Sequence, residues 1–169
     1  MHLSTVIQKS SKIKLLILDV DGVLTDGNVH YNEHGDVFRS FTVRDGTGIK
    51  NLLKSNIKIA VITGRDGNII KKRLNELGIT TIFDNQEHKV QAFNSCLEMF
   101  NLDSSQVCYM GDDMIDLGPI RLAGLSCAPN DAIDVVKSKV DYVAKTNGGK
   151  GAVREVIDVI LSSQGLLDE

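Results

Sequence analysis

Two aspartates, Asp19 and Asp21, follow an apolar stretch at residues 15–18 and precede Gly22. The apolar run is typical of a buried β-strand, and side chains two positions apart on a strand point to the same side. Gly22 allows the sharp backbone turn by which the chain then leaves the sheet. Open α/β folds bind their ligands at this carboxyl edge of the strands. A lone Asp-x-Asp sequence also occurs at ordinary strand ends, so the rest of the chain decides its meaning.

Further polar residues follow other apolar runs of the chain. Thr63 ends one such run, Lys89 follows a short one, and Asp112 comes after the run that closes at Gly111. Taken singly, each has an ordinary explanation: a turn, a solvated helix start and a helix cap. A parallel sheet would nevertheless bring all of them to one edge, together with the first two aspartates.

Clustered carboxylates repel one another unless a cation lies between them, and hard oxygen ligands suit Mg²⁺. One carboxylate can then act as a nucleophile toward phosphorus, and a second can carry protons for the leaving group and for water. A threonine hydroxyl and the amide of Gly64 can bind phosphate oxygens, and a lysine neutralises their charge in the transition state. The predicted catalytic residues are Asp19, Asp21, Thr63 and Lys89, and the predicted metal ligands are Asp19, Asp21 and Asp112.

The elements that must position these groups alternate between strand and helix patterns. Strands are expected at residues 13–20, 58–63, 80–83, 107–110, 125–128 and near 142, and helices at 47–55, 68–77, 89–100, 114–123, 132–138 and 152–163. This alternation predicts an α/β fold, a three-layer, doubly wound parallel sheet. No linker divides the chain, so residues 1–169 are expected to form one domain. The first 11 residues are polar and are expected to be a loosely held lead-in with one helical turn at most.

Two segments lie outside this alternation. Residues 26–43 have the aromatic and β-branched composition of a β-hairpin, with a glycine in the loop at 33–36. A lone hairpin is marginal in water, so its apolar side chains, among them Tyr31, Phe38 and Phe41, predict an interface. Near the C-terminus, a glycine-rich loop leads into the last helix, over about 147–163.

Composition narrows the classes of function. The 169 residues carry a net charge of −3 without a dense basic patch, which disfavours nucleic acid as a main partner. Three scattered cysteines do not form a disulfide framework. No apolar stretch is long enough for a membrane span, and the first residues lack the layout of a signal peptide. We therefore expect a cytoplasmic protein.

Together these motifs resemble those of the haloacid dehalogenase superfamily: Asp19-Val-Asp21-Gly-Val-Leu-Thr, Thr63-Gly-Arg65, Lys89 and Gly111-Asp-Asp-x-x-Asp116. More closely, the chain from about residue 13 onward resembles the capless phosphatases of 3-deoxy-D-manno-octulosonate 8-phosphate (KDO 8-phosphate). Val43-Arg-Asp-Gly-x-Gly-Ile49, Ala128-Pro-x-Asp-Ala132 and Gly148-Gly-Lys-Gly-Ala-Val-Arg-Glu155 add to that likeness.

The resemblance implies a Rossmann-like fold and a magnesium-dependent phosphomonoesterase of lipopolysaccharide precursor synthesis. It implies that Asp19 is the nucleophile, that Asp21 is the general acid and base and binds metal through its carbonyl, and that Thr63 and Lys89 hold the phosphoryl group. A homotetramer is implied as well, in which each hairpin helps to close a neighbour's site. Contacts to the sugar-acid phosphate are implied for Asp21, Thr42, Val43, Arg44, Asp45, Gly46, Lys50, Gly64, Arg65, Arg73 and Lys89.

The chain departs from the family pattern at several positions. Asp84 and Asn85 stand where the family has Gln-Gly, Gly118 precedes Pro119, and Thr47 replaces an aromatic residue or leucine. These departures bear on the sugar pocket rather than on the phosphate chemistry. A phosphatase of nine-carbon, sialic-type (nonulosonic) acid 9-phosphates therefore stays open as an alternative.

Functions of other protein classes have less support from the sequence. A receiver domain has adjacent acids after its first strand, whereas this chain has Asp-x-Asp. A non-catalytic phosphate-binding module would not need every catalytic position to be occupied. A phosphoryl mutase would need a cap that excludes water, and the chain has no insertion of that size.

Overall fold

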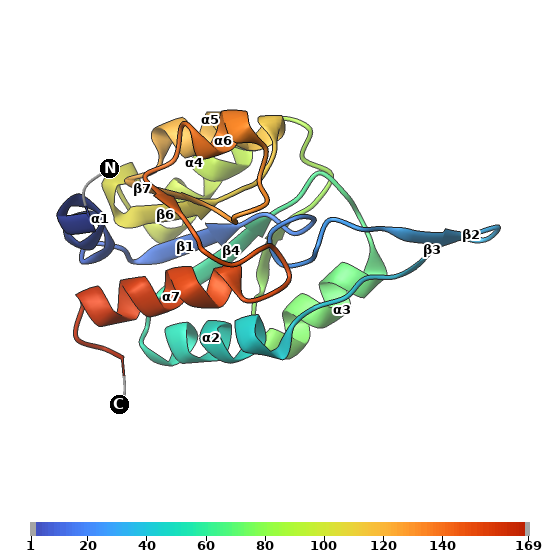
Figure 1. The fold of residues 1–169 in the computed structure, drawn as a ribbon, viewed down its shortest axis with the longest axis horizontal. Helices are drawn as coiled ribbons and strands as arrows, with labels where there is room; N and C mark the ends of the chain where they lie inside the picture. Colours follow the sequence, from blue (N-terminus) through green and yellow to red (C-terminus); the bar gives the residue numbers. More distant parts are fainter. Residues whose placement is uncertain (1–2, 168–169) are drawn as a thin grey trace.

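The structure, a computed structural model, describes residues 3–167 and contains one six-stranded sheet and one hairpin (Figure 1). The strands are β1 (Leu15–Leu18), β2 (His30–Asn32), β3 (Gly35–Phe38), β4 (Lys58–Ile62), β5 (Thr81–Phe83), β6 (Val107–Met110), β7 (Leu125–Ala128) and β8 (Tyr142–Val143). The α-helices are α1 (Leu3–Ser10), α2 (Val43–Lys54), α3 (Asn68–Leu77), α4 (Lys89–Phe100), α5 (Leu117–Leu122), α6 (Asp134–Lys137) and α7 (Ala152–Ser163), and two short 3₁₀ helices span Ser104–Gln106 and Met114–Asp116.

The large sheet is parallel and has the strand order β5-β4-β1-β6-β7-β8. The chain runs outward from β1 through β4 to β5, then returns to the other side of β1 and continues through β6. The strand order therefore reverses between β1 and β6, which is the position where doubly wound sheets bind ligands. The predicted fold class is confirmed.

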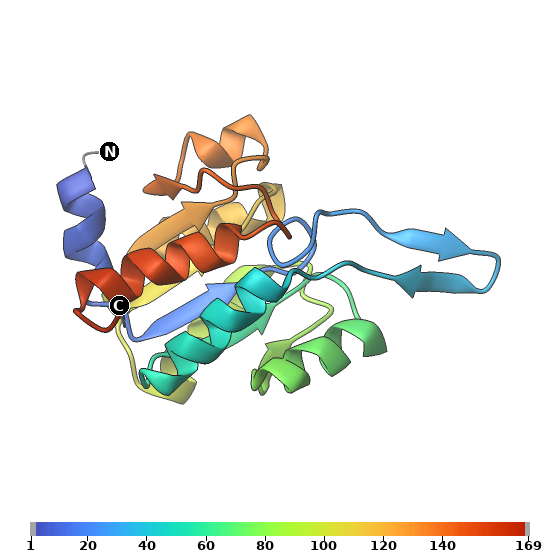
Figure 2. The ribbon, with the colours of Figure 1, turned by 60° about the horizontal axis from the view of Figure 1, so that its bottom comes forward.

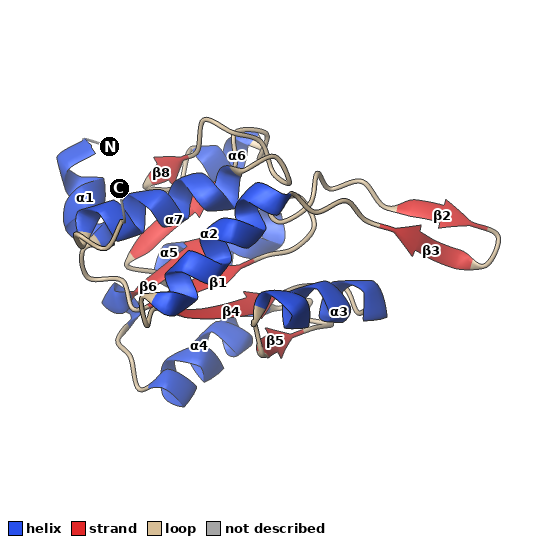
Figure 3. Ribbon diagram, turned by 90° about the horizontal axis from the view of Figure 1, so that it is seen from below, coloured by secondary structure: helices blue, strands red, loops and turns tan. Residues whose placement is uncertain are grey.

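Alternating side chains of the strands supply two separate hydrophobic cores. Leu16 and Leu18 of β1 pack in one core with α1, α2, α3 and α7, whereas Leu15 and Ile17 pack in the other with α4, α5 and α6. All four leucine and isoleucine side chains are buried, as expected for a strand covered on both faces. Figure 3 shows α2 and α7 side by side over one face of the sheet, and these two helices are in extensive contact.

The N-terminal expectation is wrong for the residues that the structure describes, while residues 1 and 2 lie outside them. Residues 3–10 form the helix α1, which packs against α7. Val6 lies in the core, and Lys9 forms an ion pair with Asp141, the Nζ–Oδ1 distance being 2.6 Å. These contacts join residues more than 130 positions apart, so no local pattern could reveal them.

The expected helices at 68–77, 89–100 and 152–163 have the observed bounds, but α2 begins four residues earlier than expected. Thr42 caps α2, its hydroxyl accepting a hydrogen bond from the Arg44 amide at 3.3 Å. The helix expected after Asp113 is divided into a 3₁₀ turn and α5, and α6 is shorter than expected.

The hairpin β2–β3 projects away from the body of the molecule (Figure 2). Tyr31 and Phe38 are exposed on it, and Phe38 stacks on His30 with ring centroids 4.0 Å apart. Phe41 was expected to be exposed, but it is half-buried against the core that contains α2 and α7. It lies at the base of the hairpin, where the chain rejoins the body.

Candidate active site

The carboxyl ends of β1, β4 and β6 surround a pocket of about 320 Å³. Among the described residues, the pocket is lined by Asp19, Asp21, Gly27, Thr63, Gly64, Arg65, Asp112, Asp113 and Ile115. Most of the predicted catalytic and metal-binding residues therefore lie together around one pocket. Lys89 does not line the pocket, but its Nζ lies 2.9 Å from Oδ2 of Asp19, which does.

Asp19 directly follows β1, and its backbone amide continues the sheet by donating to Met110 O at 3.1 Å. One carboxylate oxygen of Asp19 accepts the Val20 amide at 2.7 Å, and the other lies 2.9 Å from Lys89 Nζ. Burial and the nearby charge of Asp116 raise the pKa of Asp19 to about 7, although Lys89 acts in the opposite direction. The side chain is thus held in one orientation, with a charge that needs further compensation.

Asp116 is fully buried, and all of its acceptor capacity is used within the protein. Its Oδ1 accepts Lys89 Nζ at 2.8 Å and Tyr109 Oη at 2.6 Å, while its Oδ2 accepts the backbone amides of Asp112 and Asp113 at 3.0 and 3.2 Å. By its place in the sequence, Asp116 could either bind metal or support the turn that follows β6. These contacts indicate that Asp116 anchors that turn and Lys89.

Carboxylate oxygens of Asp19, Asp112 and Asp116 lie within 4.8 Å of one another. Burial and the charges of Asp19 and Asp116 raise the pKa of Asp112 to about 8. Burial alone would lower the pKa of Lys89, but Asp19 and Asp116 raise it above the usual value. One ammonium therefore faces three carboxylates, and an additional cation would relieve the excess negative charge.

Gly22 shows that the backbone closely approaches this cluster. Its φ is +84°, and a Cβ there would lie 2.0 Å from Oδ2 of Asp112. Only glycine fits at this position, because the Asp112 carboxylate occupies the space of a side chain. Hard oxygen donors, crowded charge and little space fit a small divalent cation such as Mg²⁺.

The carboxylate of Asp21 lies apart from that cluster, because β1 ends at Leu18 and the turn that follows displaces Asp21 from the strand. Its Oδ1 accepts a hydrogen bond of 2.8 Å from Nε of Arg39, and Nε of Arg65 lies 3.6 Å from its Oδ2. Sequence reasoning missed Arg39, and no local signal reveals it, since it lies on the hairpin 18 residues away.

The remaining predicted phosphate ligands follow β4. Thr63 is buried, and its hydroxyl accepts the Arg65 amide at 3.3 Å. The Thr63 backbone is fixed by the strand, because its amide donates to Phe83 O at 2.9 Å. Gly64 is exposed in the pocket. Arg65 thus lies near Asp21, and Gly64 lines the same pocket.

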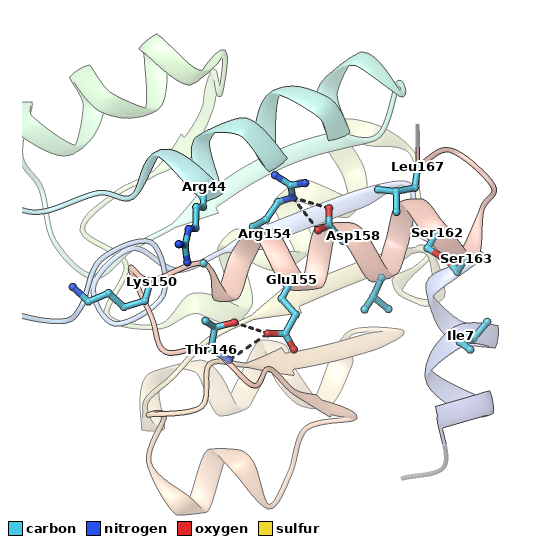
Figure 4. Close-up of a pocket in the computed structure, with 12 residues that line it drawn as sticks. Ile7, Arg44, Thr146, Lys150, Arg154, Glu155, Asp158, Ser162, Ser163 and Leu167 are labelled. Atoms are coloured by element: carbon cyan, nitrogen blue, oxygen red, sulfur yellow. Dashed lines mark hydrogen bonds and ion pairs between the residues drawn. The ribbon is translucent and has the colours of Figure 1, made fainter. Parts of the chain in front are cut away.

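The other predicted substrate contacts are not brought into this pocket within one chain. Arg44 lines a different groove of about 620 Å³, shown in Figure 4, together with Lys150 and Arg154. Asp45 is buried against α7, where it accepts the Arg154 amide at 2.8 Å, and burial raises its pKa to about 6. Thr42, Val43, Gly46, Lys50 and Arg73 do not line the catalytic pocket either. Their roles in binding substrate stay predictions.

Comparisons with known proteins show the family of the chain. The model of the haloacid dehalogenase-like hydrolases matches residues 78–157. The 3-deoxy-D-manno-octulosonate 8-phosphate phosphatase KdsC of Escherichia coli K12 is 45% identical over 97% of this chain and 87% of its own length.

Solved structures are similarly close. The crystal structure of the Yersinia pestis 3-deoxy-D-manno-octulosonate 8-phosphate phosphatase has a TM-score of 0.95 and 43% identity, covering 96% of this chain and 88% of that one. The corresponding phosphatase of Moraxella catarrhalis, in complex with magnesium, phosphate and KDO, has a TM-score of 0.94 and 37% identity, covering 97% and 94%.

Proposed function

The chain belongs to the 3-deoxy-D-manno-octulosonate 8-phosphate phosphatases of the haloacid dehalogenase superfamily, and on this premise we propose that it hydrolyses KDO 8-phosphate to KDO and inorganic phosphate. It is a phosphoric monoester hydrolase. The observation that carries the proposal is the convergence of Asp19, Asp112 and buried Lys89 beside a pocket that Asp21 and Thr63 also line.

We propose that Mg²⁺ is held by the carboxylates of Asp19 and Asp112 and by the backbone carbonyl of Asp21. Bound there, the ion supplies positive charge to the phosphate oxygens and offsets the repulsion between the carboxylates. Asp116 is not a ligand in this proposal, because its two oxygens already accept four hydrogen bonds.

The chemistry proceeds in two displacements at phosphorus. A carboxylate oxygen of Asp19 attacks, the bond from phosphorus to the sugar oxygen breaks, and the carboxyl group of Asp21 gives its proton to the departing alkoxide. Water then attacks the aspartyl phosphate and returns a proton to Asp21, and the bond to Asp19 breaks to release phosphate. Lys89 orients Asp19 and, together with Thr63 and the Gly64 amide, holds the phosphoryl oxygens.

We propose a homotetramer whose hairpins cover neighbouring sites. Three observations support it: the hairpin projects from the body, Tyr31 is 61% exposed and Phe38 50% exposed, and Arg44, Lys50 and Arg73 do not line their own chain's pocket. In a tetramer, the exposed residues Val43, Arg44 and Lys50 can contribute to the pocket of another chain. Light scattering should then give four times the 18.5 kDa chain mass, whereas a fully active monomer would contradict the shared cover.

The length of the sugar acid is tested with a matched pair of substrates. We expect kcat/KM for KDO 8-phosphate to exceed that for a nonulosonic acid 9-phosphate, and the reverse order would select the nine-carbon alternative.

We also place the chain in the cytoplasm, in lipopolysaccharide precursor synthesis. All three cysteines are free thiols, which supports a reducing compartment. No helix among residues 3–167 is long and apolar enough to cross a bilayer.

A further inference from the structure

Arg39 lies at the end of the hairpin and reaches back into the catalytic pocket. We propose that it is a positioning residue, which holds the carboxylate of Asp21 in the orientation from which it gives and takes the proton. The inference rests on the proposed function and assigns a role to a residue on the hairpin. Its side chain is 1% exposed, and its Nε donates to Asp21 Oδ1 at 2.8 Å.

The two oxygens of Asp21 have different surroundings. Oδ1 is fixed by Arg39, whereas Oδ2 is buried without a hydrogen bond, and Arg65 Nε is 3.6 Å from it. That distance is too long for a hydrogen bond. Asp21 lines the catalytic pocket, so the orientation of its carboxylate decides whether it can serve a leaving group or a water there. A general acid must be oriented before its proton transfer is effective, and a buried charge-assisted hydrogen bond supplies that orientation.

The hairpin also contacts the second arginine. Nη1 of Arg65 donates to Tyr31 Oη at 3.0 Å, and Tyr31 lies on β2. Arg39 directly follows β3 and contacts Asp21 itself, whereas Tyr31 of β2 contacts Arg65, whose Nε lies 3.6 Å from the same carboxylate. The hairpin therefore contributes to the site of its own subunit. Its exposed tip can in addition cover the site of a neighbouring subunit in the proposed tetramer. Figure 2 shows the two hairpin strands returning to the body of the molecule where β1 ends.

The test compares leaving groups. Wild type, Arg39→Ala and Arg39→Lys are assayed with Mg²⁺ on a series of substituted phenyl phosphates and on one simple alkyl phosphate. Without a well-placed acid, the leaving oxygen departs with more negative charge, so kcat/KM depends more steeply on leaving-group pKa. We expect Arg39→Ala to lose about 100-fold on the alkyl ester and about threefold or less on p-nitrophenyl phosphate. Ser40→Ala, an exposed neighbour, is the matched control and should keep the wild-type slope.

The ratio between substrates does not depend on how much of a variant is folded, so partial misfolding cannot imitate the result. Arg39→Lys keeps a cationic donor and should recover part of the wild-type slope. Equal losses on all esters would overturn the inference, as would a change in KM alone, which would make Arg39 a substrate ligand. Wild-type turnover of KDO 8-phosphate is measured alongside and tests the proposed function separately, because the slope comparison does not use that substrate.

Discussion

Lys89 Nζ and Asp116 Oδ1 are 2.8 Å apart, and both side chains are fully buried. The same ammonium lies 2.9 Å from Asp19 Oδ2. Asp116 therefore fixes the residue that orients Asp19, the proposed nucleophile, although Asp116 does not line the pocket itself. This contact links the stability of the fold to the geometry of catalysis.

Replacing Asp116 should damage both properties. Asp116→Asn weakens the buried hydrogen bonds to Lys89 and Tyr109, while Asp19 still pairs with the ammonium, so we expect a cost of about 1–3 kcal/mol. Urea denaturation should show a loss of that size together with a fall in kcat. Asp134→Asn is the control, since it removes the exposed contact with Lys137 and should change stability by less than about 0.5 kcal/mol. Wild-type stability in Asp116→Asn would mean that the buried contact is dispensable.

The sequence was enough to predict the sheet and the residues at its carboxyl edge. Strands such as 107–110 are continuous apolar runs, and the polar residues that follow them meet because the strands are parallel. Arg39 and α1 were missed for a different reason. Arg39 reaches Asp21 only because of the direction in which the hairpin leaves the body, and α1 is held by contacts with α7. Neither depends on a pattern of neighbouring residues.

Removal of the metal should abolish activity. Chelation with EDTA should stop turnover, Mg²⁺ should restore it, and Ca²⁺ should inhibit, because Ca²⁺ takes more ligands in a looser geometry. Mg²⁺ should also raise the melting temperature of the wild type, and raise that of Asp112→Asn much less. Full activity in chelated, metal-free protein would rule out the proposed site.

The buried carboxyl group of Asp45 should impose a pH dependence on stability. Burial raises its pKa from 3.8 to about 6, so the folded protein binds this proton more tightly than the unfolded chain. Its contribution to stability is therefore largest at low pH and declines as pH rises from about 3.8 to 6. Asp45→Asn keeps an acceptor for the Arg154 amide without the charge. Urea titrations at several pH values should show the variant gaining on the wild type as pH increases; a constant difference would exclude this linkage.

The nucleophile can be tested by removing its charge. Asp19→Asn retains the shape of the side chain but cannot attack phosphorus, so kcat should fall at least ~10³-fold. Asp21→Asn should also be severely impaired, since the alkoxide loses its proton donor. Circular dichroism would confirm that both variants are folded. Near-normal turnover by Asp19→Asn would eliminate a covalent step at this residue.

The most direct measurement is to trap the phosphorylated enzyme during turnover. The protein is mixed with KDO 8-phosphate carrying a radiolabelled phosphate, quenched in acid within milliseconds and digested for mass spectrometry. We predict a transient phosphoryl group on the peptide that contains Asp19, formed before phosphate is released and absent from Asp19→Asn. Label on a different residue, or release of phosphate by Asp19→Asn at the wild-type rate, would contradict the mechanism.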